Sequence, residues 1–104
     1  MSYFAYDRMG STVPSPDANQ RRRLLDSLGR EDPEHPDVSL THESGWSISA
    51  FPSGLIVFEN VETGEGPWHM RSVPAARTLE LWDALAVGKH VELVSLPWVD
   101  GHGT

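Results

Sequence analysis

The chain contains no cysteine, which excludes a disulfide framework and thiolate chemistry. It also has no apolar run near the roughly 18 residues that a membrane-spanning helix requires, so we expect no membrane association. Residues 1–13 have neither the basic nor the apolar region of a secretory signal peptide, and a cytoplasmic location is therefore expected. The 104 residues correspond to a single small domain, which leaves little room for a deep cofactor cleft.

Positive charge is missing from a long central segment. From Glu31 to Met70 there are eight acidic residues and no lysine or arginine, in a chain with 15 acidic residues, 8 basic residues and a net charge of −7. A field of one sign repels nucleic acid and attracts basic proteins. The segment therefore favours a basic protein partner over nucleic acid, and an acidic surface that only confers solubility is the alternative.

No catalytic or metal-binding motif accompanies the acidic residues. The stretch from Glu31 to Trp46 has five carboxylates and two histidines, but His35 and His42 lack the spacing of zinc ligands, and no central glycine forms a calcium loop. No serine lies in a nucleophile elbow, and no glycine-rich stretch has the lysine of a phosphate loop. We therefore predict no catalytic residue, no metal and no cofactor. The alternative is a small-ligand-binding protein or minor enzyme that uses His42, His69 and nearby carboxylates.

Two amphipathic helices are predicted from their boundary residues. A proline near the start and a glycine just past the end predict one helix over 16–28, with Ser15 as its N-cap, and another between Pro74 and Gly88. Residues 90–96 fit either a short strand or a helical turn.

The first predicted helix carries a run of three arginines, Arg21–Arg23. Three consecutive helical residues point over a wide arc, so they form no compact basic face. We expect all three on the solvated surface.

Alternating apolar and polar residues, separated by turns with glycine and proline, predict an antiparallel meander. The expected strands are 37–42, 46–51, 55–61 and 68–73. The predicted fold class is α+β: a two-layer domain with an antiparallel sheet of three to five strands covered by two amphipathic helices, in the order α-β-β-β-(β)-α-short element. Within this single domain, residues 1–13 and 99–104 are expected to be a loose arm and a loose tail.

The expected core lies between one face of the sheet and the two helices. Its residues are Trp46, Ile48, Ile56, Phe58 and Met70 from the sheet, and Leu24, Leu28, Leu79 and Trp82 from the helices. Trp68 and Trp98 lie instead at the ends of elements, where a half-buried indole often anchors an interface.

Three segments carry a resemblance to a known class of proteins: GWSISAFPSGLIVFENVETGEGPWHM, VPAARTLELWDALAVG and LPW. A hairpin that begins with Gly-Trp, a helix that opens with proline and carries Leu-x-x-Trp, and a closing Leu-x-Trp follow one another between Leu40 and Trp98. This order resembles small bacterial immunity proteins that neutralise toxins of polymorphic and contact-dependent systems. The resemblance implies tight binding to one cognate toxin and no catalysis.

Charge and resemblance together predict a small acidic, non-catalytic protein-binding domain with a basic protein partner. An immunity protein that neutralises a cognate toxin is the specific form of this hypothesis. The candidate binding residues are Glu34, Asp37, Glu62, Glu65, Trp68 and Trp98. A homodimer that forms through an exposed sheet edge or a tryptophan rim is a further alternative.

Overall fold

The computed structural model describes residues 2–29 and 37–103. These residues form an α+β domain whose antiparallel sheet has seven strands in the order β2-β1-β3-β4-β5-β6-β7. The strands are β1 (Tyr3–Tyr6), β2 (Thr12–Pro14), β3 (Val38–His42), β4 (Trp46–Ala50), β5 (Ile56–Asn60), β6 (Trp68–Met70) and β7 (Val99–Asp100).

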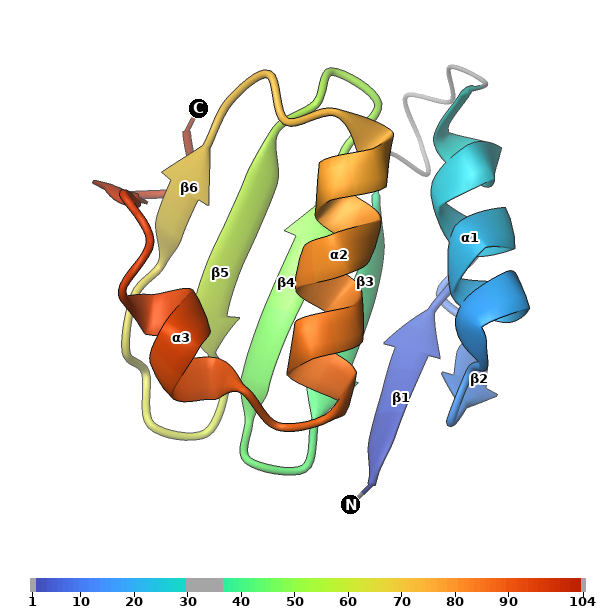
Figure 1. Ribbon diagram of the computed structural model, residues 1–104, viewed down its shortest axis with the longest axis horizontal. Coiled ribbons are helices and arrows are strands. Elements are labelled where there is room, and N and C mark those ends of the chain that lie inside the picture. The colour runs from blue at the N-terminus through green and yellow to red at the C-terminus, as the bar shows by residue number, and fades with distance from the viewer. Residues whose placement is uncertain (1, 30–36, 104) are drawn as a thin grey trace.

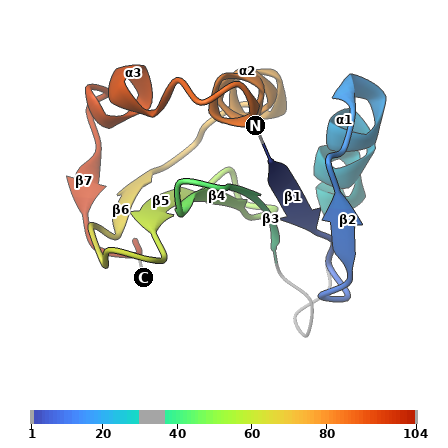
Figure 2. The ribbon, with the colours of Figure 1, turned by 90° about the horizontal axis from the view of Figure 1, so that it is seen from below.

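The helices of the described residues lie on one side of the sheet (Figures 1 and 2). They are α1 (Ala18–Asp26), continued by the 3-10 turn η1 (Ser27–Gly29), then α2 (Ala75–Ala86) and α3 (His90–Val94). Helix α2 packs on β3 and β4 and contacts both α1 and α3. The predicted α+β class is therefore confirmed, with three helices where two were predicted, and no helix of the described residues lies over the opposite face of the sheet (Figure 2).

The predicted number of strands, three to five, is wrong because both ends of the chain add strands to the central meander. In the expected arm, β1 pairs with β3, with Ala5 opposite Leu40, and the side chain of Ala5 is 0% exposed. In the expected tail, β7 pairs with β6, with Val99 opposite His69. Strands of two to four residues carry too little alternation to be recognised, and pairing with their neighbours is what fixes them.

The first helix is confirmed, but it begins two residues later than predicted. Its N-cap is Asp17, whose Oδ1 accepts a hydrogen bond from the Gln20 N–H at 2.8 Å, while the Gln20 Oε1 accepts one from the Asp17 N–H at 2.9 Å. This reciprocal pair is a capping box, and it satisfies two backbone donors that the helix itself leaves unpaired. Ser15, the predicted cap, instead has a φ of 44°.

The second helix is also confirmed, with Pro74 at its N-cap position. The ambiguous segment 90–96 is helical as α3 and not a strand.

Ser15 gives a first testable prediction, because its positive φ is unfavourable for any residue with a side chain. The conformation is held by the Ser15 N–H, which donates to the Tyr3 carbonyl at 3.0 Å. Ser15→Gly is expected to raise the free energy of unfolding by about 0.5–1 kcal/mol, measured by chemical denaturation. Ser27→Gly is the matched control, because Ser27 has a φ of −62° and should lose stability. A loss for both variants would contradict the prediction.

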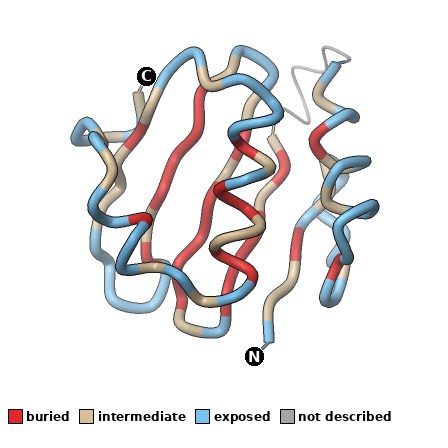
Figure 3. The backbone as a smooth tube through the Cα atoms, viewed as in Figure 1, coloured by how far each residue is buried: buried red, intermediate tan, exposed pale blue. Residues whose placement is uncertain are grey.

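The core lies between α2 and the central strands, where buried residues concentrate (Figure 3). Its predicted members Trp46, Ile48, Ile56, Phe58 and Trp82 are buried, whereas Met70, Leu24, Leu28 and Leu79 are only partly buried against it. The buried leucines of α1 and α2 are Leu25, Leu81 and Leu85. The prediction therefore assigned the wrong side of α2 to the core. It placed Leu79 there, whereas Leu81 is the buried residue.

Arg21 is not the solvated residue that the sequence suggested. Its side chain is 12% exposed, and its Nε donates to Asp83 Oδ1 of α2 at 2.8 Å. Its Nη1 also donates to the Pro16 carbonyl at 2.7 Å and to the Tyr3 hydroxyl at 3.1 Å. Arg21 therefore joins α1 to both α2 and β1, whereas Arg22 and Arg23 are exposed as expected.

Candidate functional site

The face of the sheet opposite the helices has none of the described helices over it (Figure 2). Side chains alternate along a strand, so the residues that do not point toward the helices point to this face. We call it the helix-free face, and its side chains from β1 and from β3 to β6 are Phe4, Tyr6, Ser39, Thr41, Ser47, Ser49, Val57, Glu59 and His69.

The centre of the helix-free face carries hydroxyl side chains, of which those of Thr41 and Ser47 are largely buried between their neighbours. Thr41 and Ser47 lie opposite each other on β3 and β4, and the Thr41 hydroxyl donates to the Ser47 Oγ at 3.0 Å. At the β1 side, the rings of Phe4 and Tyr6 meet edge to face with centroids 5.3 Å apart. None of the cavities found among the described residues lies at this hydroxyl-lined centre, which therefore suits contact with another surface more than enclosure of a small molecule.

Two turns meet at one end of this face. Asn60, which is 4% exposed, donates from Nδ2 to the Ser44 carbonyl of the β3–β4 turn at 3.2 Å. Its Oδ1 accepts from the N–H groups of Glu62 and Thr63 in the β5–β6 turn at 2.9 and 3.0 Å. The Asn60 side chain therefore holds the two turns together.

The joined turns carry most of the carboxylates at this end. Glu43 lies on the first turn, and Glu62 and Glu65 lie on the second, all three exposed to solvent. Glu59, at the end of β5, lies 3.6 Å from His102, measured from Oε2 to Nε2. We call these four glutamates the acidic end. A cavity of about 300 Å³ adjoins it, lined by Glu59, Asn60, Val61, Gly64, Glu65, Gly66, Pro67 and His102.

The candidate acidic residues from the sequence do not form one surface. Glu62 and Glu65 are together at the acidic end. Asp37 directly precedes β3, whose first residue, Val38, pairs with Ala50 at the opposite end of the sheet. Glu34 lies outside the described residues. The described part of the acidic segment therefore runs back and forth across the sheet. The turns at one end of the sheet bring together only some of its carboxylates.

Trp68 and Trp98 lie on the helix side of the sheet, in an aromatic cluster. The Phe58 ring is stacked between Trp46 and Trp98, with centroids at 4.7 and 5.0 Å, and Trp68 lies 5.9 Å from Trp46. The Trp98 Nε1–H donates to the Leu93 carbonyl of α3 at 2.7 Å. Both indoles are partly exposed, but they share no surface with the helix-free face.

His42 and His69, the pair of the alternative hypothesis, point to opposite faces of the sheet. His42 shares the helix side with Leu40, and its Nδ1 accepts from the Ser44 N–H at 3.1 Å. His69 is on the helix-free face, where its Nδ1–H donates to the Gly101 carbonyl at 2.9 Å. The two rings therefore line no common cleft. Residues 2–29 and 37–103 also contain no group of three or more His, Asp or Glu placed to hold a metal ion.

Sequence reasoning missed Asn60, Glu43 and the Glu59–His102 pair. An asparagine at the end of a strand, followed by Val-Glu-Thr-Gly, is a signal for a side-chain-capped turn and could have identified Asn60. The position of the turn that carries Glu43 next to the β5–β6 turn depends on strand register, which no local pattern displays.

Comparisons with protein-family models, with curated proteins and with solved structures found no match for the chain. In the part of the chain that the structure describes, no helix has the length and apolar character needed to cross a membrane.

Proposed function

We propose that the chain is a non-catalytic protein-binding domain that binds a basic protein through the acidic end and the adjoining helix-free face. The observation that carries the proposal is the tie through Asn60, which joins the turn that carries Glu43 to the turn that carries Glu62, at the border of the helix-free face. Carboxylates fixed at the border of a flat surface increase the rate of encounter with a positively charged partner and orient it.

The edges of the sheet are poorly suited to the same task, which favours the face as the contact surface. At one edge, Pro14 of β2 lies opposite Phe4, one position from the Ser15 N–H that bonds to β1. The Pro14 nitrogen therefore points outward and offers no hydrogen-bond donor to an added strand. At the other edge, β7 has two residues. Addition of a strand from a partner or from a second copy has little to pair with at either edge.

Neutralisation of a basic toxin in the cytoplasm is the specific form of binding that we propose. The resemblance to immunity proteins covers Leu40 to Trp98, a range that includes the acidic end and the central strands. Such binding needs no catalytic group and no cofactor. It requires a preformed surface of complementary charge, with a few well-packed contacts that slow dissociation.

The test begins with the partner, which is obtained by pull-down from the source cell or by co-expression with the product of the adjacent gene. The triple variant Glu43→Lys, Glu62→Lys and Glu65→Lys is then compared with the native chain by stopped-flow association. We expect association to slow by about tenfold at low salt, and its dependence on salt concentration to become weaker.

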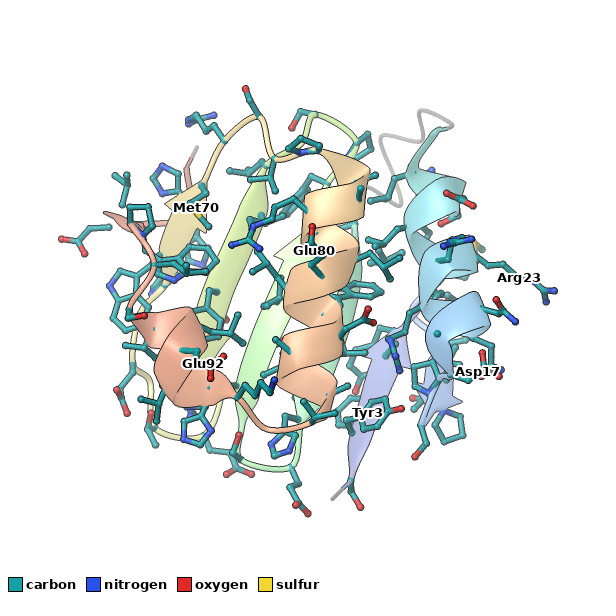
Figure 4. All side chains as sticks on the ribbon, in the orientation of Figure 1. Tyr3, Asp17, Arg23, Met70, Glu80 and Glu92 are labelled. Carbon is teal, nitrogen blue, oxygen red and sulfur yellow. The ribbon has the colours of Figure 1, made fainter. Side chains whose placement is uncertain are left out.

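A second triple variant controls for net charge. Asp26→Lys, Glu80→Lys and Glu92→Lys reverse three exposed carboxylates on helices α1, α2 and α3, and Figure 4 shows Glu80 and Glu92 on α2 and α3. This control should bind at close to the native rate. Equal slowing by both triple variants would show that only total charge matters, and binding of DNA or RNA at physiological salt would overturn the proposal.

A further inference from the structure

The last described residues, Gly101–Gly103, fold back over the helix-free face. The Gly101 N–H donates to the Pro67 carbonyl at 2.9 Å, and the Gly101 carbonyl accepts from the Nδ1–H of His69 at 2.9 Å. Farther along, the Gly103 carbonyl accepts from the Arg71 guanidinium. The segment thus reverses after β7 and runs along β6 on the side away from the helices, where Figure 2 places the C-terminal end.

This segment, which we call the strap, covers the apolar part of the helix-free face. Leu55, Val57 and His69 are buried although no helix lies over them. Gly103 fits against them without space for a side chain, because a Cβ atom there would lie 2.8 Å from Leu55 Cδ1 and 2.9 Å from His69 Cδ2. The strap therefore lies directly over Leu55 and His69.

The contacts that hold the strap are few, and side chains make most of them. The His102–Glu59 pair is largely exposed and contributes little. Gly101 and Gly103 have φ values of 93° and 78°, and glycine loses more conformational freedom than any other residue when it is ordered. A segment with these properties opens at a lower free energy than the paired strands beneath it.

We propose that the strap is a displaceable cover that opens while the sheet stays folded and limits the partner's access to Leu55, Val57 and His69. The effect on the partner's access rests on the proposed function, whereas the opening of the strap does not. The strap and the partner then compete for the same surface. The apparent affinity for the partner is the affinity of the open form multiplied by the fraction of chains in which the strap is open.

Hydrogen exchange of the native chain tests the opening without a partner. The Gly101 N–H is expected to exchange on the order of a hundredfold faster than the most protected amides of β4 and β5, with little dependence on low denaturant concentrations. If the Gly101 N–H exchanges at the same rate and with the same denaturant dependence as those amides, the strap opens only when the whole domain unfolds, and the proposal is wrong.

A substitution at Gly103 tests the covering role. Gly103→Ala should displace the strap and make His69 several-fold more reactive toward diethylpyrocarbonate. The matched control is Gly10→Ala, because Gly10 has a φ of 79° and nothing within 4 Å of an added Cβ. Unchanged His69 reactivity in Gly103→Ala would contradict the cover.

The same pair of variants addresses access of the partner. With the basic partner in hand, Gly103→Ala should associate several-fold faster than Gly10→Ala. A slower rate would show that the strap is part of the contact surface and not a competitor for it. If no basic partner exists, the proposed function fails, while hydrogen exchange and His69 reactivity still decide whether the strap opens.

Discussion

Replacing Trp82 with alanine is expected to lower the free energy of unfolding by about 3–5 kcal/mol, a larger effect than that expected for Asn60→Ala or Ser15→Gly. The Trp82 side chain is 0% exposed and lies between α2 and the centre of the sheet. Its Nε1–H donates to the Ile48 carbonyl at 3.2 Å, so the substitution removes both a large apolar group and a buried donor. Urea denaturation monitored by circular dichroism measures the loss.

Trp82→Phe separates the two contributions. Phenylalanine retains an aromatic ring but has no donor for the Ile48 carbonyl, so a smaller loss of about 1–2 kcal/mol is expected. A loss below about 1 kcal/mol for Trp82→Ala would show that this residue does not support the core.

Replacing Asn60 with alanine is expected to cost about 2–4 kcal/mol, although Asn60 is polar and lies at the end of a strand. The substitution leaves the Glu62 and Thr63 N–H groups without their acceptor, and it removes the donor to the Ser44 carbonyl. Each buried group that loses its partner costs about 1–3 kcal/mol, with partial compensation by water at the turns. The measurement is again chemical denaturation.

The control for Asn60 is the same substitution at the other asparagine of the chain. Asn19 is exposed in α1, where alanine is the better helix former, so Asn19→Ala should be neutral or slightly stabilising. If Asn60→Ala is also neutral, the two turns are held by their backbone hydrogen bonds alone, and the acidic end does not depend on Asn60.

The central meander could be predicted from the sequence because several local signals agree there. Strands β3 to β6 have alternating residues and intervening turns with glycine, and their boundaries were predicted to within a few residues. Strands β1, β2 and β7 gave no comparable signal, because each is short and gains its stability from an adjacent strand. In α2, the choice between Leu79 and Leu81 depended on how the helix rotates onto the sheet, which apolar spacing alone does not fix.

The candidate site was only partly predictable for a different reason. The charge of Glu62 and Glu65 is visible in the sequence, and their position at the same end of the sheet as Glu43 is a consequence of strand register. Asp37 carries the same charge in the same segment, yet it lies at the opposite end of the sheet. Composition predicted the sign of the surface charge. The pairing of the strands determines which carboxylates lie at the same end of the sheet.

The path of the strap also determines how the chain can be attached to a surface or joined to another protein. Gly103, the last described residue, lies on the helix-free side of the sheet, whereas β1, at the start of the described residues, lies near the opposite edge (Figure 2). A tether or fusion joined to the C-terminal end would pull on the strap and stand in front of the helix-free face. A tether joined ahead of Tyr3 would leave the strap free but would lie next to Glu43 of the acidic end, because the Glu43 N–H donates to the Ser2 carbonyl at 2.8 Å. The attachment end alone could therefore change the binding that an assay measures for the same chain.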